Sequence, residues 1–146
     1  MLAAPRTATV LVVEDDRNLR ELYRSALVAS RYHVSVAADG LAALTTIERT
    51  RPDVVVLDLG LPGVNGWDVY RDLRAQKETE TLPIIIVTGH ALRDIDGVTS
   101  RAFLKSPWIL SSWSRRWMMR CIRSGHSRRS SLGSSPCECP CLAQIE

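Results

Sequence analysis

The most constraining feature of the sequence is the run from Val54 to Gly66, in which an apolar stretch ends in one acidic residue, Asp58. Four aliphatic residues, most of them β-branched, precede Asp58 and predict a strand covered on both faces of a parallel sheet. The Leu-Pro-Gly and Asn-Gly signals that follow predict an exposed turn. Such an Asp is most often only a turn former or a helix cap. However, ligands of open α/β sheets bind at the carboxyl ends of strands, so Asp58 is a candidate functional residue.

Apolar runs alternate with amphipathic stretches along the chain. We expect strands at 9–13, 33–37, 54–58 and 83–87, with a short fifth strand at 101–105. Between them, helical spacing predicts three apolar stripes, formed by Leu19, Leu22, Tyr23, Ala26 and Leu27, then by Leu41, Leu44 and Ile47, and then by Val69, Tyr70 and Leu73. Asp16 is interpreted as a helix cap and Asp39-Gly40 as a turn or cap. This order predicts an α/β fold with a doubly wound parallel sheet.

Length and composition indicate one ordinary globular domain. The 146 residues are 45% hydrophobic and 24% charged, which suits a single core of moderate size. No apolar run approaches the roughly 20 residues of a membrane helix, and the first residues lack the apolar centre of a signal peptide. We therefore expect a cytoplasmic protein that does not engage a membrane.

The predicted strand ends carry chemically useful side chains, namely Glu14, Asp15, Asp58, Thr88 and Lys105. In a parallel sheet these ends meet at one rim, where neighbouring carboxylates repel one another unless a cation is present. Carboxylate oxygens, aided by the Gly60 carbonyl, suit Mg²⁺. An acidic site with a hydroxyl and an ammonium group favours phosphoryl transfer, with Asp58 as the nucleophile.

Three segments together resemble the receiver domain of response regulators in two-component signalling. They are Leu11–Asp16, Leu57–Gly66 and Val87–His90, which together span most of residues 8–90. The resemblance implies a flavodoxin-like, five-stranded parallel sheet of order 2-1-3-4-5. It also implies a partner, either a sensor histidine kinase or a phosphotransfer protein.

The resemblance implies a role for each matching residue. Asp58 corresponds to the phosphoacceptor, Glu14 and Asp15 to the acidic metal pair, Gly60 to the carbonyl ligand, and Thr88 to the hydroxyl that moves toward the phosphoryl group. We expect a phosphorylation switch rather than a turnover enzyme. The alternative is a degraded or interaction-only receiver without phosphorylation-dependent output. A flavin or nucleotide domain of the same topology is disfavoured, because no Gly-rich phosphate loop follows the first strand.

The chain departs from the family pattern after Lys105, so we divide it into a receiver domain, 7–105, and an atypical tail, 106–146. The tail holds six Arg against two Glu and all four Cys, and it is expected to be disordered. It has no helix-turn-helix pattern and no convincing zinc spacing, so we expect neither nucleic-acid nor zinc binding. Our hypothesis is a frameshift near Lys105 that removed or replaced the last helix.

The genetic code supports that hypothesis. Trp and Met have one codon each, so a reading two bases on must place Asp at Trp108-Ile109 and Asp-Asp at Trp117–Met119. Permitted codons for the other residues complete Lys-Pro-Leu-Asp-Pro-Glu-Leu-Leu-Val-Glu-Ala-Val-Asp-Asp-Ala, which is typical of a receiver's last loop and fifth helix. Whether Lys105 occupies the family's lysine position therefore stays open.

Overall fold

The computed structural model describes residues 7–87 and 102–104 of the chain. Its elements are β1 (Thr9–Val13), α1 (Arg17–Ala29), β2 (His33–Ala37), α2 (Gly40–Thr50), β3 (Val54–Asp58), α3 (Gly66–Ala75), β4 (Ile84–Val87) and β5 (Ala102–Leu104). Thr88, Lys105 and the 106–146 tail lie outside the described residues, and so does the predicted replacement of the last helix. Every strand that the sequence predicts is present, with bounds that differ by at most one residue.

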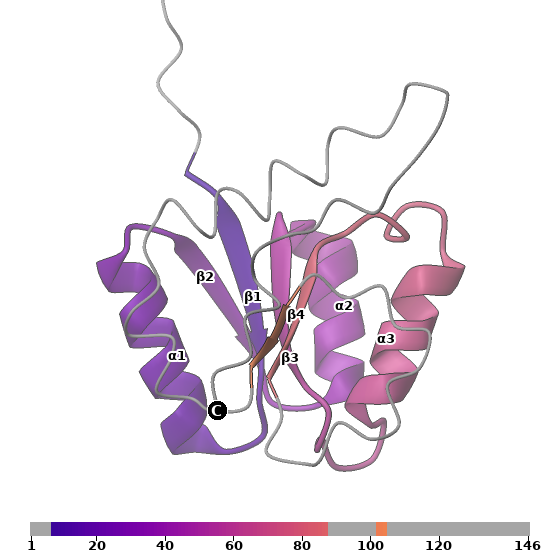
Figure 1. Cartoon of the computed structure of the whole chain (residues 1–146), viewed down its shortest axis with the longest axis horizontal. Coiled ribbons are helices and arrows are strands. Elements are labelled where there is room, and N and C mark those ends of the chain that lie inside the picture. The colour runs from indigo at the N-terminus through magenta and orange to yellow at the C-terminus, as the bar shows by residue number, and fades with distance from the viewer. Residues whose placement is uncertain (1–6, 88–101, 105–146) are drawn as a thin grey trace, which may run out of the picture.

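The strands form one parallel sheet in the order β2-β1-β3-β4-β5, and Figure 1 shows β1 beside β2. The flavodoxin-like order expected from the resemblance is therefore confirmed. Two residue pairs between neighbouring strands bear on the position of the functional groups. Val13 of β1 pairs with Leu57 of β3, and Asp58 of β3 pairs with Val87 of β4. The residues that follow β1 and the last residue of β3 consequently lie at the same edge of the sheet.

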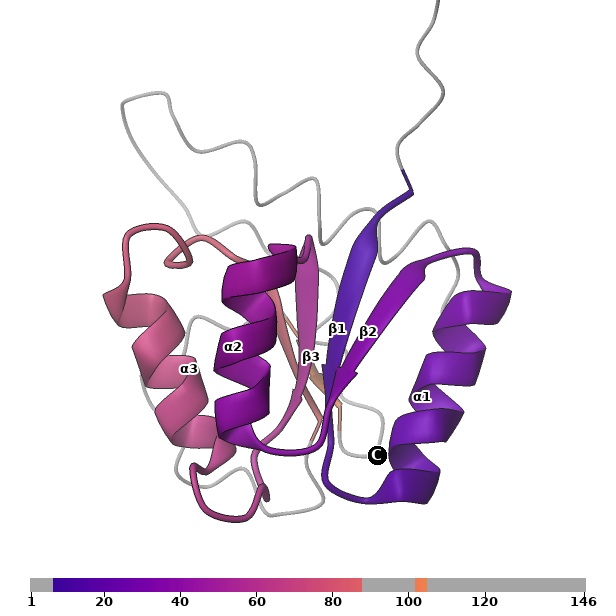
Figure 2. The same cartoon turned by 180° about the vertical axis from the view of Figure 1, so that it is seen from behind.

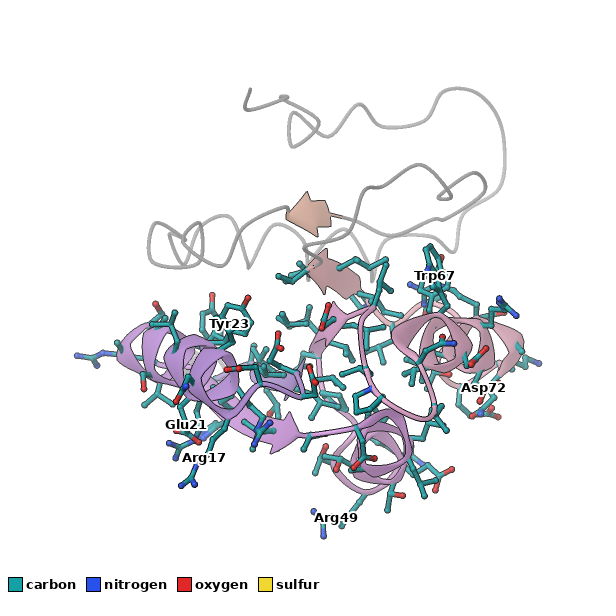
Figure 3. The ribbon with its side chains drawn as sticks, turned by 90° about the horizontal axis from the view of Figure 1, so that it is seen from below. Arg17, Glu21, Tyr23, Arg49, Trp67 and Asp72 are labelled. Atoms are coloured by element: carbon teal, nitrogen blue, oxygen red, sulfur yellow. The ribbon has the colours of Figure 1, made fainter. Side chains whose placement is uncertain are left out.

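Helices cover both faces of the sheet (Figures 1 and 2). Viewed along the strands, α1 lies on one side of the sheet, and α2 and α3 lie on the other (Figure 3). Alternate residues of β1 point to different layers: Val10 and Val12 pack with α1, whereas Leu11 and Val13 pack with α2 and α3. Since β1, β3 and β4 are buried between the layers, their apolar runs show no polar alternation.

Each described helix begins at a polar cap. Asp16 accepts hydrogen bonds from the backbone N–H groups of Asn18 and Leu19 at 2.8 and 2.9 Å, which begins α1. Asp39 accepts one from Ala42 at 2.8 Å, which begins α2. These side chains satisfy N–H groups that lack a partner within the helix. Both caps that the sequence predicted are confirmed.

Two residues of the predicted apolar stripes are not part of the core. Leu22 is 43% exposed and Leu41 is 66% exposed. On α2 the buried positions are Gly40, Ala43 and Ile47, so the prediction for Ile47 is confirmed. The prediction for Leu22 and Leu41 was wrong because helical spacing identifies a common side of a helix without fixing how much of that side the sheet covers.

Candidate functional site

An acidic cluster occupies the carboxyl edge of the sheet. Glu14 and Asp15 follow β1, and Asp58 ends β3 beside it. One carboxylate oxygen of each residue lies within 4.8 Å of the other two. The structure thus brings together three of the residues singled out by sequence, from segments more than 40 positions apart.

The three carboxylates differ in exposure. Glu14 is buried, with 4% of its surface exposed, whereas Asp58 is partly buried and Asp15 is exposed. Burial, the largest cause, and the nearby charge of Asp58 together raise the pKa of Glu14 from 4.5 to about 7. The backbone N–H of Asp16, 3.3 Å from Oε1 of Glu14, partly opposes that rise in pKa. Negative charge is therefore costly at Glu14 without a compensating cation.

This donor set fits a hard divalent cation such as Mg²⁺. All three side chains offer carboxylate oxygens, which Mg²⁺ prefers, and the outermost, Asp15, leaves the cluster open to water. Gly60 lies two residues after Asp58, in the exposed segment between β3 and α3. Its backbone carbonyl is the fourth ligand expected from the resemblance, and it would add an oxygen without adding another full negative charge.

Arg20 fixes the segment that carries two of these acids. Its guanidinium Nη1 donates to the carbonyl oxygens of Glu14 at 2.7 Å and Asp15 at 3.0 Å. The backbone N–H of Glu14 also donates to the carbonyl of Ala37 in β2 at 3.1 Å. Sequence reasoning missed Arg20 because it lies among other charged residues of α1. The available signal was its position, one turn into the helix that follows the acids.

The segment between β3 and α3 is held at several points. Leu61 is 5% exposed and belongs to the core beneath α2 and α3. Asn65 caps α3 by accepting from the backbone N–H of Asp68 at 2.9 Å, and the N–H of Gly66 donates to the carbonyl of Leu59 at 3.3 Å. Gly63 has a φ of 73°, a conformation that other residues rarely adopt. These features fix the path of the segment that carries Gly60.

Tyr23 lies on α1, on the side of the helix opposite Arg17 and Glu21 (Figure 3). It is 1% exposed, and the sequence predicted it as a core residue, which is confirmed. Burial raises the pKa of the Tyr23 hydroxyl, and the charges of Glu14 and Asp58 raise it further. Tyr23 therefore stays neutral beside the acids.

The two remaining predicted site residues follow strand ends but lie outside the described residues. Thr88 comes directly after Val87, the strand partner of Asp58. Lys105 comes directly after Leu104, the strand partner of Val87. Thr88 and Lys105 thus follow, in the sequence, two residues that are paired in neighbouring strands, which agrees with the prediction that both come at strand ends. The roles of Thr88 and Lys105 stay predictions.

A parallel sheet of this order with an acidic cluster at its carboxyl edge is the arrangement expected of a receiver domain. The family described as "Response regulator receiver domain" matches residues 10–99. The chain belongs to this family.

Curated relatives agree with this family. DNA-binding response regulator MtrA of Mycolicibacterium paratuberculosis is 44% identical over 80 residues, which cover 55% of this chain and 34% of that protein. Response regulator MprA of Mycobacterium sp. (strain KMS) has the same identity and coverage. The match therefore spans about a third of the length of these relatives.

Solved structures give the same result. Chemotaxis response regulator CheY4 of Vibrio cholerae is 25% identical, with a TM-score of 0.68, over 80% of this chain and 99% of that one. The receiver domain of sensor histidine kinase PA1611 from Pseudomonas aeruginosa PAO1 is 27% identical, with a TM-score of 0.66, over 82% and 97% of the two chains. That structure is described with a magnesium ion coordinated in its active-site cleft.

Proposed function

We propose that this chain is a phosphorylation switch in which Asp58 receives a phosphoryl group from the phosphohistidine of a sensor histidine kinase or a phosphotransfer protein. The observation that carries the proposal is the acidic cluster, in which carboxylate oxygens of Glu14, Asp15 and Asp58 lie within 4.8 Å of one another. Family membership and the magnesium ion in the PA1611 receiver support it.

The residues of the site have separate roles in this reaction. An oxygen of Asp58 attacks phosphorus while the phosphorus–nitrogen bond of the donor breaks, and the released imidazole takes up a proton. Glu14, Asp15, Asp58 and the Gly60 carbonyl would hold Mg²⁺. When bound, Mg²⁺ neutralises charge on the transferring phosphoryl oxygens. Arg20 keeps the segment bearing Glu14 and Asp15 in place through their carbonyls.

Thr88 and Lys105 complete the proposed mechanism. The Thr88 hydroxyl would donate a hydrogen bond to the new phosphoryl group, and the Lys105 ammonium would pair with one of its oxygens. The resulting change in contacts would alter which partner binds near the end of the sheet. We propose a switch of this kind, and not a turnover enzyme, acting in the cytoplasm. Among the described residues, no helix is long and apolar enough to cross a membrane.

The proposal is tested by phosphorylation with acetyl phosphate, followed by intact-protein mass spectrometry. We expect the wild-type chain to gain one phosphoryl group when Mg²⁺ is present and none when EDTA is present. Asp58→Asn should abolish the gain. Asp16→Asn is the matched control, because it removes a neighbouring charge while Asn still caps α1. Labelling that persists in Asp58→Asn, or that ignores EDTA, contradicts the proposal.

A wild-type chain that shows no Mg²⁺-dependent labelling would support the other hypothesis, an interaction-only or degraded receiver. Circular dichroism of the same samples separates that outcome from misfolding. A folded chain that binds Mg²⁺ without accepting a phosphoryl group has an intact metal cluster and a defect in the remaining part of the site.

A further inference from the structure

The first residue of α2 lies against the segment between β3 and α3. Gly40 is buried, and a Cβ atom added to it would overlap the carbonyl oxygen of Val64 and lie 2.9 Å from Cβ and Cγ1 of that residue. Carbon atoms that are not bonded pack at about 3.5–4.0 Å. The helix and the segment can therefore touch in this arrangement only because residue 40 has no side chain.

A second close approach holds the other end of the same segment. A Cβ atom at Gly66 would overlap the carbonyl oxygen of Asp58 and lie 2.6 Å from Cα of Leu59. Gly60 thus lies between one contact at Asp58 and another at Val64. Gly63 differs from both, because a Cβ there meets nothing within 4 Å.

We propose that Gly40 is a positioning residue of the acidic site: its contact with Val64 fixes the segment that carries the Gly60 carbonyl. The inference deepens the proposed function and rests on it, because its consequence is measured as Mg²⁺ binding. The three atoms nearest to a Cβ at Gly40 all belong to Val64, so Gly40 would act on the site through residues 60–64.

The segment, and not the helix, would yield to a side chain at position 40. Ala43 and Ile47 anchor α2 in the core with 0% and 3% of their surfaces exposed, whereas Val64 is 37% exposed. Gly66 packs against Asp58 and Leu59, so the segment has little room to move at that end. We expect the displacement at Val64 to be taken up on its other side, by residues 60–63, which include Gly60. Metal sites tolerate misplacement of only about 0.5 Å.

The experiment measures Mg²⁺ affinity by calorimetry for the full chain and for two variants that disturb the contact from opposite sides. Gly40→Ala adds a methyl group that would overlap Val64, whereas Val64→Ala removes methyl groups from the contact and creates no overlap. We expect Mg²⁺ binding about tenfold weaker in Gly40→Ala, as when residues that support metal ligands are changed. Val64→Ala should weaken binding about threefold. If Gly40→Ala does not fold, the result for Val64→Ala decides.

Two control variants separate positioning from general destabilisation. Leu41→Ala changes the neighbouring residue of α2, which is 66% exposed. Ile47→Val weakens the core under the same helix, by about 0.5–1.5 kcal/mol. We expect both controls to bind Mg²⁺ within about twofold of wild type, although Ile47→Val unfolds at a lower temperature.

The outcomes distinguish this inference from the proposed function. A wild-type chain that binds no Mg²⁺ overturns the proposed function, and the inference with it. If the wild type binds Mg²⁺ and both Gly40→Ala and Val64→Ala bind it with the same affinity as the wild type, the inference alone is overturned. An affinity loss in Ile47→Val as large as that in Gly40→Ala also overturns it, because destabilisation would then account for both.

Discussion

Replacing Glu14 by Gln should stabilise the metal-free protein in a manner that depends on pH. The folded chain raises the pKa of this carboxyl from 4.5 to about 7. Each pKa unit corresponds to about 1.4 kcal/mol, so the charged form costs the folded state up to about 3 kcal/mol. Gln keeps the oxygen that accepts the Asp16 N–H, at 3.3 Å, and carries no charge.

The direction of the pH dependence follows from where the proton is bound. Between about pH 4.5 and 7 the folded chain holds a proton on Glu14 that the unfolded chain has lost. The stability of the wild type therefore falls as the pH rises through this range, and this contribution levels off above it. We expect Glu14→Gln to exceed the wild type by up to about 3 kcal/mol near pH 8, and by less than about 1 kcal/mol near pH 5.

The assay is urea unfolding in EDTA, followed by circular dichroism across this pH range. Glu48→Gln, on the exposed surface of α2, controls for the substitution itself. Equal stability of Glu14→Gln and wild type near pH 8, or a difference that does not shrink in acid, would refute the electrostatic reasoning. Adding Mg²⁺ extends the test, because a ligand at about 100 times its dissociation constant stabilises by about 2.7 kcal/mol. That gain should appear in the wild type and be much reduced in the variant.

Three further predictions concern other parts of the chain. Arg20→Met should weaken Mg²⁺ binding several-fold in calorimetry, because two carbonyls lose the donor that positions them; unchanged affinity would contradict this role. Leu57→Ala should lower the free energy of unfolding by about 2–5 kcal/mol because Leu57 is fully buried, whereas Leu41→Ala should change it by less than about 0.5 kcal/mol in the same urea titration. Sequencing the gene should show codons after Lys105 that spell Lys-Pro-Leu-Asp in the shifted frame, and any other reading there rejects the frameshift.

The sheet was predictable from sequence because its central strands are buried on both faces. Runs such as Val54–Leu57 contain no polar residue, so their length and their acidic end mark the strand without any knowledge of the partners. Helix starts were predictable for a similar local reason, since Asp16 and Asp39 bond to backbone groups within three residues. The resemblance, and not the periodicity, supplied the order of the strands.

Features that depend on contacts between distant segments were not predictable in this way. The spacing of Leu41 on α2 matches that of a core residue, yet the residue is 66% exposed. Arg20 reads as one more surface charge until its bonds to the preceding carbonyls are known. Gly40 was interpreted as part of a turn or cap, because the absence of a side chain gives no periodic signal. Only the position of Val64 shows that the absence itself is required.

At the acidic site, carboxylates that repel one another are carried by segments that are held firmly in place. Glu14, Asp15 and Asp58 repel one another, so without a cation a loose segment would move apart to relieve the repulsion. Instead, Arg20 holds the first segment, and glycines at positions 40 and 66 allow the second to pack closely. The repulsion is consequently retained in the folded chain, where a divalent cation can relieve it. Loosening either support should therefore both lessen the pH-dependent loss of stability and weaken Mg²⁺ binding.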